Sequence, residues 1–551
     1  MRTPVATLLL LGLLTFMLGL GRQAITDADE AYYAEAAREM VASGDWLTPH
    51  FNFVDRWQKP VLYYWAAAAT FVAAGTSEWG ARGFSAMSGL ALVLLTYRIG
   101  RRLLTRDAAW IGAAITATCY GYFAMARLAL PDLPLAFFIT ATIALWLEER
   151  PLLAGLAAGL GFLDKGPLAL LVPALVLVPL AWRERRWPLI GSRVARPVLL
   201  TPTALALGAV ACVVVATPWY VAMTAAHGRA YLDSFFIGDN LERFATDRFN
   251  SPRAVWFYIP IVIGGVFPWT AYLLVLPWRR AIAVLRRQAA LTSEEWRLLM
   301  WVAAPLIFFT LSIGKQPRYI LPVLPPLALL LGASIAKRLR GGARAAADGA
   351  RELTIATWIT AAIYFLLAAL LYRARPILIN VAPGGTLAGI AALMAAGVAL
   401  VITAAGRQRQ RLPSVMAVSA AALLLTVQFG ALSGRRPEAV EVMAQLVAQH
   451  RTGGESLGIY QVLTRNLVFY TGVRQEELFN ADQATQFLSR PERVLLVVRA
   501  ADADVLRMQL SQPLVELGRV VYLDPASIKL GTFLVPDANT ALDNVVLVAN
   551  R

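Results

Sequence analysis

Long apolar runs separated by short polar segments make up most of this chain. A hydrocarbon core about 30 Å thick is crossed by about 20 apolar residues in a helix. By that measure we expect spans near residues 5–21, 80–97, 108–126, 131–147, 152–163, 166–182, 198–220, 254–277, 298–313, 319–336, 353–372, 385–405 and 412–432. These thirteen runs predict an α-helical membrane protein. The first run resembles a secretion signal, but the many spans after it favour a retained first helix.

Basic residues gather in alternate connections between these runs. With the N-terminus in the cytoplasm, the inside connections are "YRIGRRLLTR", "WRERRW", "WRRAIAVLRRQ", "AKRLRGGARAAADGAR" and "GRQRQR", all rich in arginine, whereas the outside connections are mixed or acidic. This distribution follows the positive-inside rule. An odd number of spans then places the chain after residue 433 on the outer side of the membrane.

The last part of the chain has the composition of a soluble domain. Short β-branched runs, "ESLGIYQVL", "RVLLVVRA", "GRVVYL" and "DNVVLVAN", predict strands, and "PEAVEVMAQLVAQH" predicts a helix. We therefore expect a transmembrane domain at 1–433, with a first outer loop at about 22–79, and an outer α/β domain at 434–551. The domain shows no phosphate-binding loop, which favours a lid or a scaffold.

Composition supports this division and excludes other classes of protein. Hydrophobic residues make up 58% of the 551 residues and charged residues 16%, well below the roughly 25% charged residues of soluble proteins. The net charge of +16 is spread over short clusters, which argues against nucleic-acid binding. Cys119 and Cys212 both lie in apolar runs, so we expect no disulfide framework.

The first outer loop begins with the acidic segment "TDADEAYYAEAAREMVASGDW", residues 26–46. Asp27 and Glu30 have the spacing of a capping box, with Ile25 as its hydrophobic staple, and Glu35 and Arg38 form a helix-surface pair. A short amphipathic helix on the membrane surface accounts for most of these residues. It accounts less well for the adjacent carboxylates of Asp29 and Glu30 in one helical turn.

Other charged residues stand beside apolar runs on the same predicted side. They are Asp132 in "LPDLP", Asp164 and Lys165 in "DKGPLAL", Lys59, Arg82, Arg243, Lys315, Arg318 and the neighbouring Tyr319. A charge at the bilayer centre costs about 2.5–3.5 kcal/mol on insertion scales, so such residues usually face a cavity or a partner. We therefore predict a polar cavity open to the outer side that contains both carboxylates and cations.

This mixture of charges suits a lipid-linked sugar. Cations at the membrane edge can match a lipid phosphate, and carboxylates can bind sugar hydroxyls or an oxocarbenium-like transition state. When a polyprenyl-phosphate sugar loses its sugar, the phosphate gains negative charge, so preorganised Lys and Arg bind the product-like state more strongly than the donor.

The motifs together resemble the C-type integral-membrane glycosyltransferases of the protein mannosyltransferase-like superfamily. The matching segments are "DADEAYYAEAAREMVASGDWLTPHFN", "KP" at 59–60, "LPDLPLAF", "DKGPLAL", "FFIGDNLERFA", "WFYIPIVIGGVFPW" and "GKQPRYILP". Within this superfamily the chain is similar to the transferases that move 4-amino-4-deoxy-L-arabinose from undecaprenyl phosphate to lipid A. The resemblance implies a multi-pass protein of the bacterial inner membrane, with its active site and C-terminal domain in the periplasm, that gives polymyxin resistance.

The resemblance also implies roles for particular residues. The predicted catalytic carboxylates are Asp29, Glu30, Asp132 and, ranked lower, Asp55. The predicted lipid-phosphate ligands are Lys59, Arg82, Lys165, Arg243, Lys315, Arg318 and Tyr319. A lipid A phosphate is already ionised, so we expect Asp29 or Glu30 to orient the sugar and stabilise positive charge rather than remove a proton. The family often has Thr where this chain has Asp164, which leaves that residue as a partner of Lys165 or as an additional site residue.

Several alternatives stay open. The sugar could be another polyprenyl-linked one, as in protein O-mannosylation, or the chain could be a lipid flippase, although no internal repeat favours a transporter. His50, His227 and His450 are too few and too scattered for a histidine metal cluster. No cofactor is required by the pattern, and a divalent ion held by one of these histidines and a carboxylate is the remaining possibility.

Overall fold

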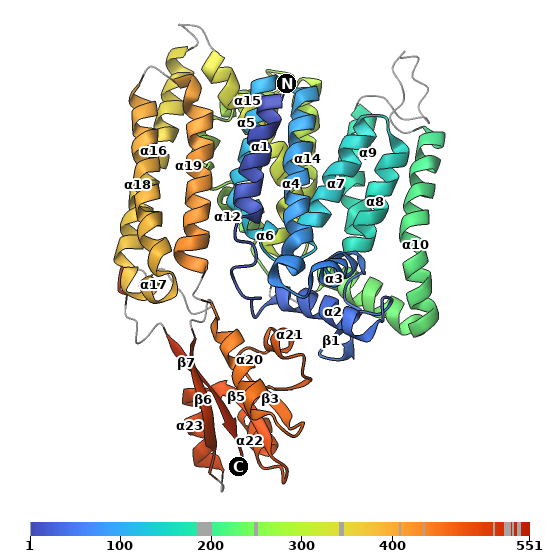
Figure 1. Cartoon of the computed structure of the whole chain (residues 1–551). Helices are drawn as coiled ribbons and strands as arrows, with labels where there is room; N and C mark the ends of the chain where they lie inside the picture. Colours follow the sequence, from blue (N-terminus) through green and yellow to red (C-terminus); the bar gives the residue numbers. More distant parts are fainter. Residues whose placement is uncertain are drawn as a thin grey trace.

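A bundle of long helices carries a smaller sheet domain at one end in the computed structural model (Figure 1). The structure describes residues 2–183, 201–246, 252–340, 346–406, 409–433, 436–510, 513–522, 531, 534–536 and 542–551. In this part of the chain, six helices are long and apolar enough to cross a membrane. An α-helical membrane protein of several passes is therefore confirmed, whereas the number of thirteen spans stays a prediction.

The helices of the bundle follow the predicted apolar runs closely. Up to residue 183 they are α1 (Arg2–Gly12), η1 (Leu13–Met17), α4 (Glu78–Leu103), α5 (Arg106–Thr118), α6 (Tyr120–Ala126), α7 (Asp132–Leu147), α8 (Pro151–Lys165) and α9 (Leu168–Arg183). The middle of the chain forms α10 (Pro202–Leu232), η2 (Asp233–Glu242), α11 (Arg243–Ala245), η3 (Val255–Phe257), α12 (Tyr258–Gly265), η4 (Thr270–Val275), α13 (Trp278–Leu285), α14 (Ser293–Leu311), η5 (Pro317–Val323) and α15 (Leu324–Arg340). The last part of the bundle consists of α16 (Ala346–Arg373), α17 (Arg375–Val381), α18 (Pro383–Ala405), η6 (Arg409–Arg411), α19 (Leu412–Val427) and η7 (Gln428–Leu432).

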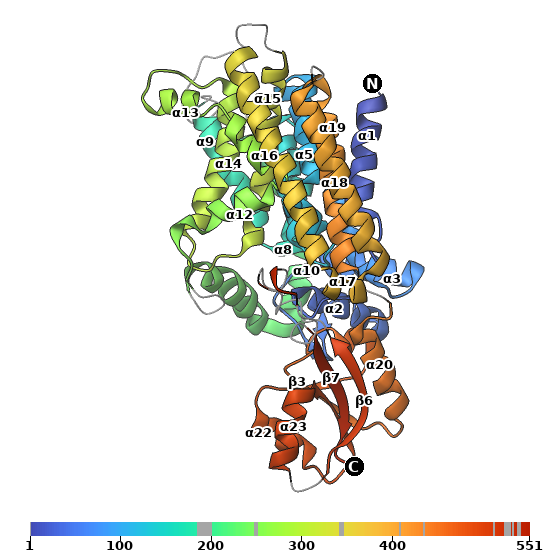
Figure 2. The same cartoon turned by 90° about the vertical axis from the view of Figure 1, so that its left-hand side faces the viewer.

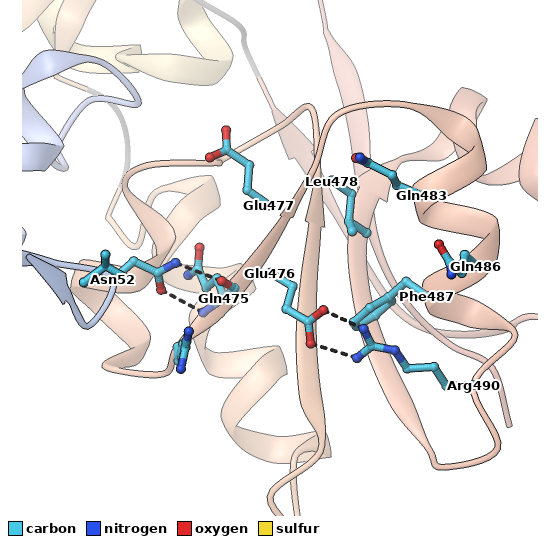
Figure 3. A pocket seen from close by; sticks show the side chains of 11 residues that line it. Asn52, Gln475, Glu476, Glu477, Leu478, Gln483, Gln486, Phe487 and Arg490 are labelled. Carbon is cyan, nitrogen blue, oxygen red and sulfur yellow. Dashed lines mark hydrogen bonds and ion pairs between the residues drawn. The ribbon is translucent and has the colours of Figure 1, made fainter.

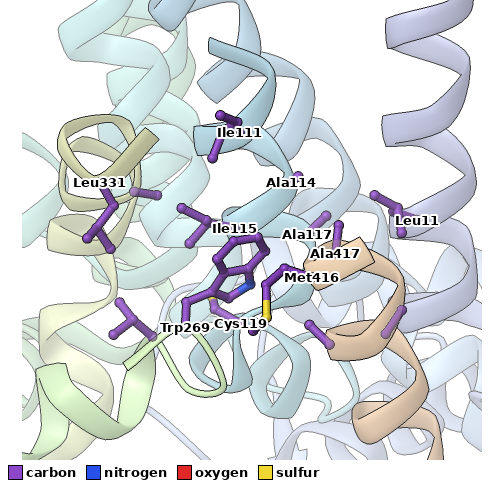
Figure 4. Packing of buried hydrophobic residues seen from close by; sticks show 14 of the residues in the cluster. Leu11, Ile111, Ala114, Ile115, Ala117, Cys119, Trp269, Leu331, Met416 and Ala417 are labelled. Carbon is purple, nitrogen blue, oxygen red and sulfur yellow. The ribbon is translucent and has the colours of Figure 1, made fainter. Parts of the chain in front are cut away.

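Two predicted spans are interrupted. The run at 108–126 breaks at Cys119, where the backbone N–H of Tyr120 donates to Phe267 O over 2.7 Å instead of continuing α5. The run at 254–277 is not one helix but three short pieces, since Pro268 lacks an N–H and follows two glycines and a non-helical turn. Trp269, beside that proline, is buried among the helices around Cys119 and donates to Thr118 Oγ1 over 3.0 Å (Figure 4).

Helix α10 lies at the edge of the bundle and packs on α8 through small residues. A Cβ added at Gly155 of α8 would lie 2.1 Å from Gly208 O of α10, and one at Gly159 would lie 2.9 Å from Cys212 O. Backbones approach this closely only where both helices have small residues, as in many membrane helix pairs. Elsewhere α10 exposes apolar side chains such as Val210 and Val214.

The first loop lies at the end of the bundle opposite the N-terminus (Figure 1). It contains α2 (Asp29–Ser43), the two-residue strands β1 (His50–Phe51) and β2 (Val54–Asp55), and α3 (Leu62–Ala74). The predicted capping box of α2 is wrong. The N-cap is Ala28, whose methyl group cannot accept a hydrogen bond, and Asp27 and Glu30 are bound to other partners described below.

The C-terminal domain, residues 436–551 as far as they are described, lies beyond this loop (Figures 1 and 2). Its elements are α20 (Ala439–His450), β3 (Ser456–Tyr460), α21 (Leu467–Thr471), β4 (Gln475–Leu478), α22 (Ala481–Leu488), β5 (Val494–Arg499), α23 (Ala500–Gln509), β6 (Val515–Tyr522) and β7 (Asp543–Ala549). The strand order is β4-β3-β5-β7-β6, with β3 parallel to β4 and β5, and β7 antiparallel to β5 and β6. The predicted small α/β domain is thus confirmed, although its boundary at residue 434 lies outside the described residues.

Candidate functional site

Polar ends of several helices meet where the bundle faces the first loop. The N-termini of α2 and α7, the C-terminus of α8, and the short helices η2 and η5 all supply charged side chains there. Gly166 ends α8 with a φ of +85°, and a Cβ at that position would lie 2.7 Å from Phe235 Cζ. This glycine therefore allows η2 to pack against the end of α8, which brings the two charged segments together.

Asp132 lies at the centre of one group of ion pairs. Lys165 Nζ donates to Asp132 Oδ1, and Arg318 Nε lies 3.4 Å from the same oxygen. Arg318 Nη2 also donates to Asp29 Oδ2 over 2.5 Å, and Lys165 lies 5.6 Å above the ring of Tyr319. Asp132 is buried, whereas Asp29 is half-exposed.

Asp239 is the shared partner of a second group of ion pairs, which includes Arg243 and Lys59. Arg243 Nη2 donates to Asp239 Oδ1 over 2.8 Å, and Lys59 Nζ lies 3.5 Å from the same oxygen. Burial lowers the pKa of Lys59 to about 7. The negative charge of Asp239 opposes this shift, whereas the positive charges of Arg243, Lys165 and Arg56 add to it.

Burial acts to raise the pKa of Asp29. The neighbouring Arg318 guanidinium overcomes this effect and holds that pKa below its ordinary value. Asp29 is therefore an ionised carboxylate at neutral pH, and one that is accessible from outside.

We call these eight residues the charged cluster. Its cations are Arg56, Lys59, Lys165, Arg243 and Arg318, and its carboxylates are Asp29, Asp132 and Asp239. With every member ionised, five positive charges face three negative ones, and these eight described residues carry a net charge of +2. Such an excess in a partly buried site favours binding of an anion, and a phosphate monoester has about the matching charge.

Glu30 and Arg82 form a separate pair deeper in the protein. Both are 1% exposed, and Arg82 Nε donates to Glu30 Oε1 over 2.7 Å. Glu30 also accepts hydrogen bonds from the backbone of Thr26 and Ala129, over 3.0 Å each. Burial acts to raise the pKa of Glu30, but the Arg82 charge and these bonds hold it below its ordinary value. The pair therefore joins three segments of backbone and offers no open face to a substrate.

Asp55 and Lys315 lie in other surroundings. Asp55 Oδ1 lies 3.2 Å from His50 Nε2, and Asp55 Oδ2 lies 3.7 Å from His227 Nδ1. Lys315 Nζ donates to the carbonyl oxygens of Ser312 over 2.5 Å and Arg253 over 3.3 Å. Of the predicted site residues, the structure thus brings together Asp29, Asp132, Lys59, Lys165, Arg243, Arg318 and Tyr319, and it leaves Glu30, Arg82, Asp55 and Lys315 outside the charged cluster.

Asp164 is not the partner of Lys165, since that lysine binds Asp132. Its side chain is fully buried, and neither carboxylate oxygen has a hydrogen-bond partner among the described residues. The same part of the chain contains no group of three or more His, Cys, Asp and Glu side chains that could hold a metal ion.

Two members of the cluster, Asp239 and Arg56, were not predicted from the sequence. Asp239 precedes Arg243 by four residues in a helical segment, so the i, i+4 rule could have identified the pair. Arg56 follows Asp55 directly and gave no separate signal. Its guanidinium lies 4.1 Å above the ring of Tyr32, a contact that only the folded first loop reveals.

Comparisons with known proteins identify relatives of this chain. Residues 7–229 match the family model described as dolichyl-phosphate-mannose-protein mannosyltransferase. An undecaprenyl phosphate-α-4-amino-4-deoxy-L-arabinose arabinosyl transferase of Pseudomonas fluorescens is 34% identical over 60% of this chain and 60% of its own length. A transferase of the same description from Pseudomonas aeruginosa is 33% identical over 66% of each chain. The chain thus matches less than two thirds of the length of these curated relatives.

Solved structures share the whole architecture. Crystal structures of ArnT from Cupriavidus metallidurans, in the apo state and bound to undecaprenyl phosphate, have TM-scores of 0.73 and 0.72. Each match covers 99% of this chain and 98% of the other, at 22% sequence identity. At this identity the match shows a common fold, including the C-terminal domain.

Proposed function

We propose that the chain belongs to the protein mannosyltransferase-like superfamily of C-type integral-membrane glycosyltransferases, and that it transfers 4-amino-4-deoxy-L-arabinose from undecaprenyl phosphate to a phosphate of lipid A. In this proposal, residues 1–433 form the transferase domain and residues 434–551 a periplasmic domain. The names of the relatives support this donor and this sugar. The net positive charge of the charged cluster is the structural observation that supports the transfer reaction.

The change in phosphate charge explains the need for this excess. The bond between the sugar C1 and the donor phosphate oxygen breaks, and a bond between C1 and a lipid A phosphate oxygen forms. The donor phosphate changes from a monoanionic diester to a monoester dianion, so the cluster stabilises the leaving group more than the bound donor. Lys59 and Arg243 bind this phosphate in the proposal, since both cations converge on Asp239 at the edge of the cluster.

Apolar side chains beside the cluster support entry of a lipid from the bilayer. Ile313 N and Ser312 Oγ donate to Phe244 O over 3.0 and 3.2 Å, which brings the end of α14 beside Arg243. Around this junction the exposed apolar side chains are Ile237, Leu241, Val255, Trp256 and Leu311. A polyprenyl chain lying against them would place its phosphate next to the cluster.

The carboxylates take different parts in this reaction. A lipid A phosphate monoester can attack as an anion, so proton balance requires no general base. Asp29 is the half-exposed member and orients the sugar through its hydroxyls and its ammonium group. Asp132 is buried between two cations and positions Lys165 and Arg318. Glu30 and Arg82 maintain the fold of the loop.

The orientation in the membrane follows from the basic connections. The last turn of α4 contains Arg101 and Arg102, and α13 contains Arg279 and Arg280. The end of α4 (Figure 1) and α13 (Figure 2) both lie at the end of the bundle that carries the N-terminus, away from the first loop. The positive-inside rule places that end in the cytoplasm. The charged cluster and the C-terminal domain then face the periplasm of an inner-membrane enzyme.

The proposal is tested by incubating the full chain in lipid nanodiscs with the aminoarabinosyl donor and lipid A. We expect mass spectra to show lipid A that has gained one aminopentose. Lys59→Met and Arg243→Met should each lower kcat/KM about 10²-fold, as expected for removal of one charge-stabilising donor. Arg340→Met is the matched control, because Arg340 pairs with Asp107 at an exposed site at the opposite end of the bundle.

A second experiment supplies the same protein with a different donor and acceptor. Polyprenyl-phosphate mannose with a Ser/Thr peptide tests protein O-mannosylation, which the match of residues 7–229 to the mannosyltransferase family favours as the alternative. Mannosylated peptide without aminopentose on lipid A would refute the proposed function and support the alternative.

A further inference from the structure

The C-terminal domain binds the chain segment that leads into α2. Ala24 N donates to Glu438 Oε1 over 2.9 Å, and Ile25 N donates to Tyr470 Oη over 2.8 Å. Ile25 O accepts from Asn466 Nδ2 over 2.9 Å. Backbone groups next to the first membrane helix are thus satisfied by residues more than 400 positions later in the chain.

Asp27 is the central contact of this interface. Its Oδ1 accepts from Arg465 N over 2.7 Å, and its Oδ2 accepts from Thr464 N over 3.1 Å. The turn before these amides contains Gln461 and Leu463 with φ of +56° and +53°, in the left-handed region that side chains rarely adopt. This conformation directs two successive N–H groups at one carboxylate.

The helix that carries Asp29 starts without a side-chain cap. Helix starts usually gain stability from an Asp, Ser or Asn at the N-cap, but α2 has Ala28 there. Asp27, one residue earlier, has the right chemistry for capping, yet its carboxylate points to the C-terminal domain. Besides the bonds of Glu30 within the membrane domain, the helix start is therefore held by the C-terminal domain and not by a side chain at the N-cap.

A second contact with the C-terminal domain holds the hairpin of β1 and β2 in the first loop. Asn52 and Phe53 have φ of +55° and +62°, as in a two-residue type I′ hairpin turn between β1 and β2. The Asn52 amide group pairs with the backbone of Gln475 in both directions, each over 2.8 Å, at the start of the edge strand β4. Figure 3 shows this pair beside the pocket formed by β4 and α22.

We propose that the C-terminal domain is a positioning element for the membrane site, and that Asp27 is the positioning residue through which it places Asp29 against Arg318. This inference rests on the proposed function only for the role of Asp29 in transfer. Only Ala28 separates the anchored Asp27 from the half-exposed Asp29, so a displaced helix start moves Asp29 away from the sugar. Lys59 and Arg243 lie on other segments and keep the donor phosphate bound.

Asp27→Ala in the full chain tests the proposal. We expect kcat for sugar transfer to fall about tenfold while KM for the donor stays within about twofold. Asp27→Asn, which keeps one of the two acceptor positions as an uncharged oxygen, should give an intermediate kcat. Hydrogen exchange should accelerate in residues 24–34 and stay unchanged in strands β5 and β7.

Asp45→Ala is the matched control. Asp45 follows α2 in the same loop and also accepts two backbone N–H groups, from Leu47 over 2.9 Å and Thr48 over 3.0 Å, but both belong to its own segment. We expect it to change kcat less than twofold. Equal losses of kcat in Asp27→Ala and Asp45→Ala, or faster exchange throughout β5 and β7, would overturn the positioning role.

The exchange measurement separates the two proposals. If the unmodified chain transfers no aminoarabinose, the proposed function fails. Selective acceleration at residues 24–34 in Asp27→Ala would still support the anchoring of the helix start, and unchanged exchange there would overturn it.

Discussion

Replacing Glu30 by alanine tests whether this buried carboxylate maintains the fold or takes part in the reaction. The Arg82 guanidinium beside it is 1% exposed and uses all five of its N–H donors. Two of them bind Glu30, and three bind the carbonyl oxygens of Leu20, Gln23 and Ala24, over 2.7 to 2.9 Å. Arg82 therefore connects the end of the first membrane helix to α2, and this connection depends on the carboxylate of Glu30.

The size of the effect follows from the burial of this pair. Removing one partner of a buried ion pair costs about 3–5 kcal/mol, because the other charge stays buried without compensation. Glu30→Ala also leaves the N–H groups of Thr26 and Ala129 without their acceptor, at about 1–3 kcal/mol for each such group. We therefore expect a loss at the upper end of the range, about 5 kcal/mol, which is a large part of the 5–15 kcal/mol typical of a folded domain.

Equilibrium unfolding with SDS in mixed micelles measures this loss. The control is Asp29→Asn, the neighbouring half-exposed carboxylate, which should abolish most sugar transfer while changing the free energy of unfolding by less than about 0.5 kcal/mol. The double variant Glu30→Leu/Arg82→Met removes both charges and should be more stable than Glu30→Ala.

The opposite pattern would refute this reasoning. If Glu30→Ala unfolds within about 1 kcal/mol of the unmodified chain but loses transfer, Glu30 acts in the reaction and the structural assignment is wrong. A double variant less stable than Glu30→Ala would show that the cost does not come from the uncompensated charge of Arg82.

Three further predictions use other titratable groups. Lys59 has a pKa of about 7 and must be protonated to bind phosphate, so kcat/KM should fall as pH rises through about 7. Lys59→Arg should move this fall to higher pH, because arginine stays protonated. An unchanged pH–rate profile in the variant would contradict the assignment. Asp164→Leu, which removes the polar atoms, should raise the free energy of unfolding by about 1–2 kcal/mol, because a buried polar group without a hydrogen bond costs about 1–3 kcal/mol. A destabilised variant would show that the carboxylate has a partner. Burial, together with the hydrogen bond and charge of Glu35, raises the pKa of Glu39 to about 8. Protonated Glu39 contributes its full stability below about pH 4.5, and this contribution is lost as pH rises through about 8. The free energy of unfolding, measured at pH 6.5 and 9.5, should therefore change less with pH in Glu39→Gln than in the unmodified chain. An equal change in both proteins would disprove the assignment.

The local pattern of the sequence predicts much of this fold. Apolar runs such as 385–405 became single helices, here α18, because a membrane helix satisfies its own backbone. The β-branched runs at 493–500 and 543–550 became the buried strands β5 and β7. Strand β4 escaped prediction, since "QEEL" has none of the β-branched residues that mark its neighbours.

The site was predictable only in part, because a charge beside an apolar run does not reveal its partner. Asp132 and Lys165 were both expected at the site and do meet there. Glu30 has the same sequence signal as Asp29, yet Glu30 is buried against the buried guanidinium of Arg82, whereas Asp29 is half-exposed beside Arg318. Asp55 pairs with histidines from two segments, a contact that the spacing of residues along the chain could not indicate.

Helices α8 and α10 touch along a narrow line of small residues, so we expect the surrounding lipid to help hold α10 against the rest of the protein. Helix α10 leads directly into η2, which carries Asp239, while Lys165 ends α8, so the two parts of the charged cluster meet beside the contact of these helices. Close backbone contact and the buried side chains of Trp219 and Tyr220 hold α10 in place. The exposed valines of this helix are open to contact with acyl chains, and we expect that contact to help keep it in place. Harsh solubilisation that strips these lipids should therefore abolish turnover before it unfolds the bundle.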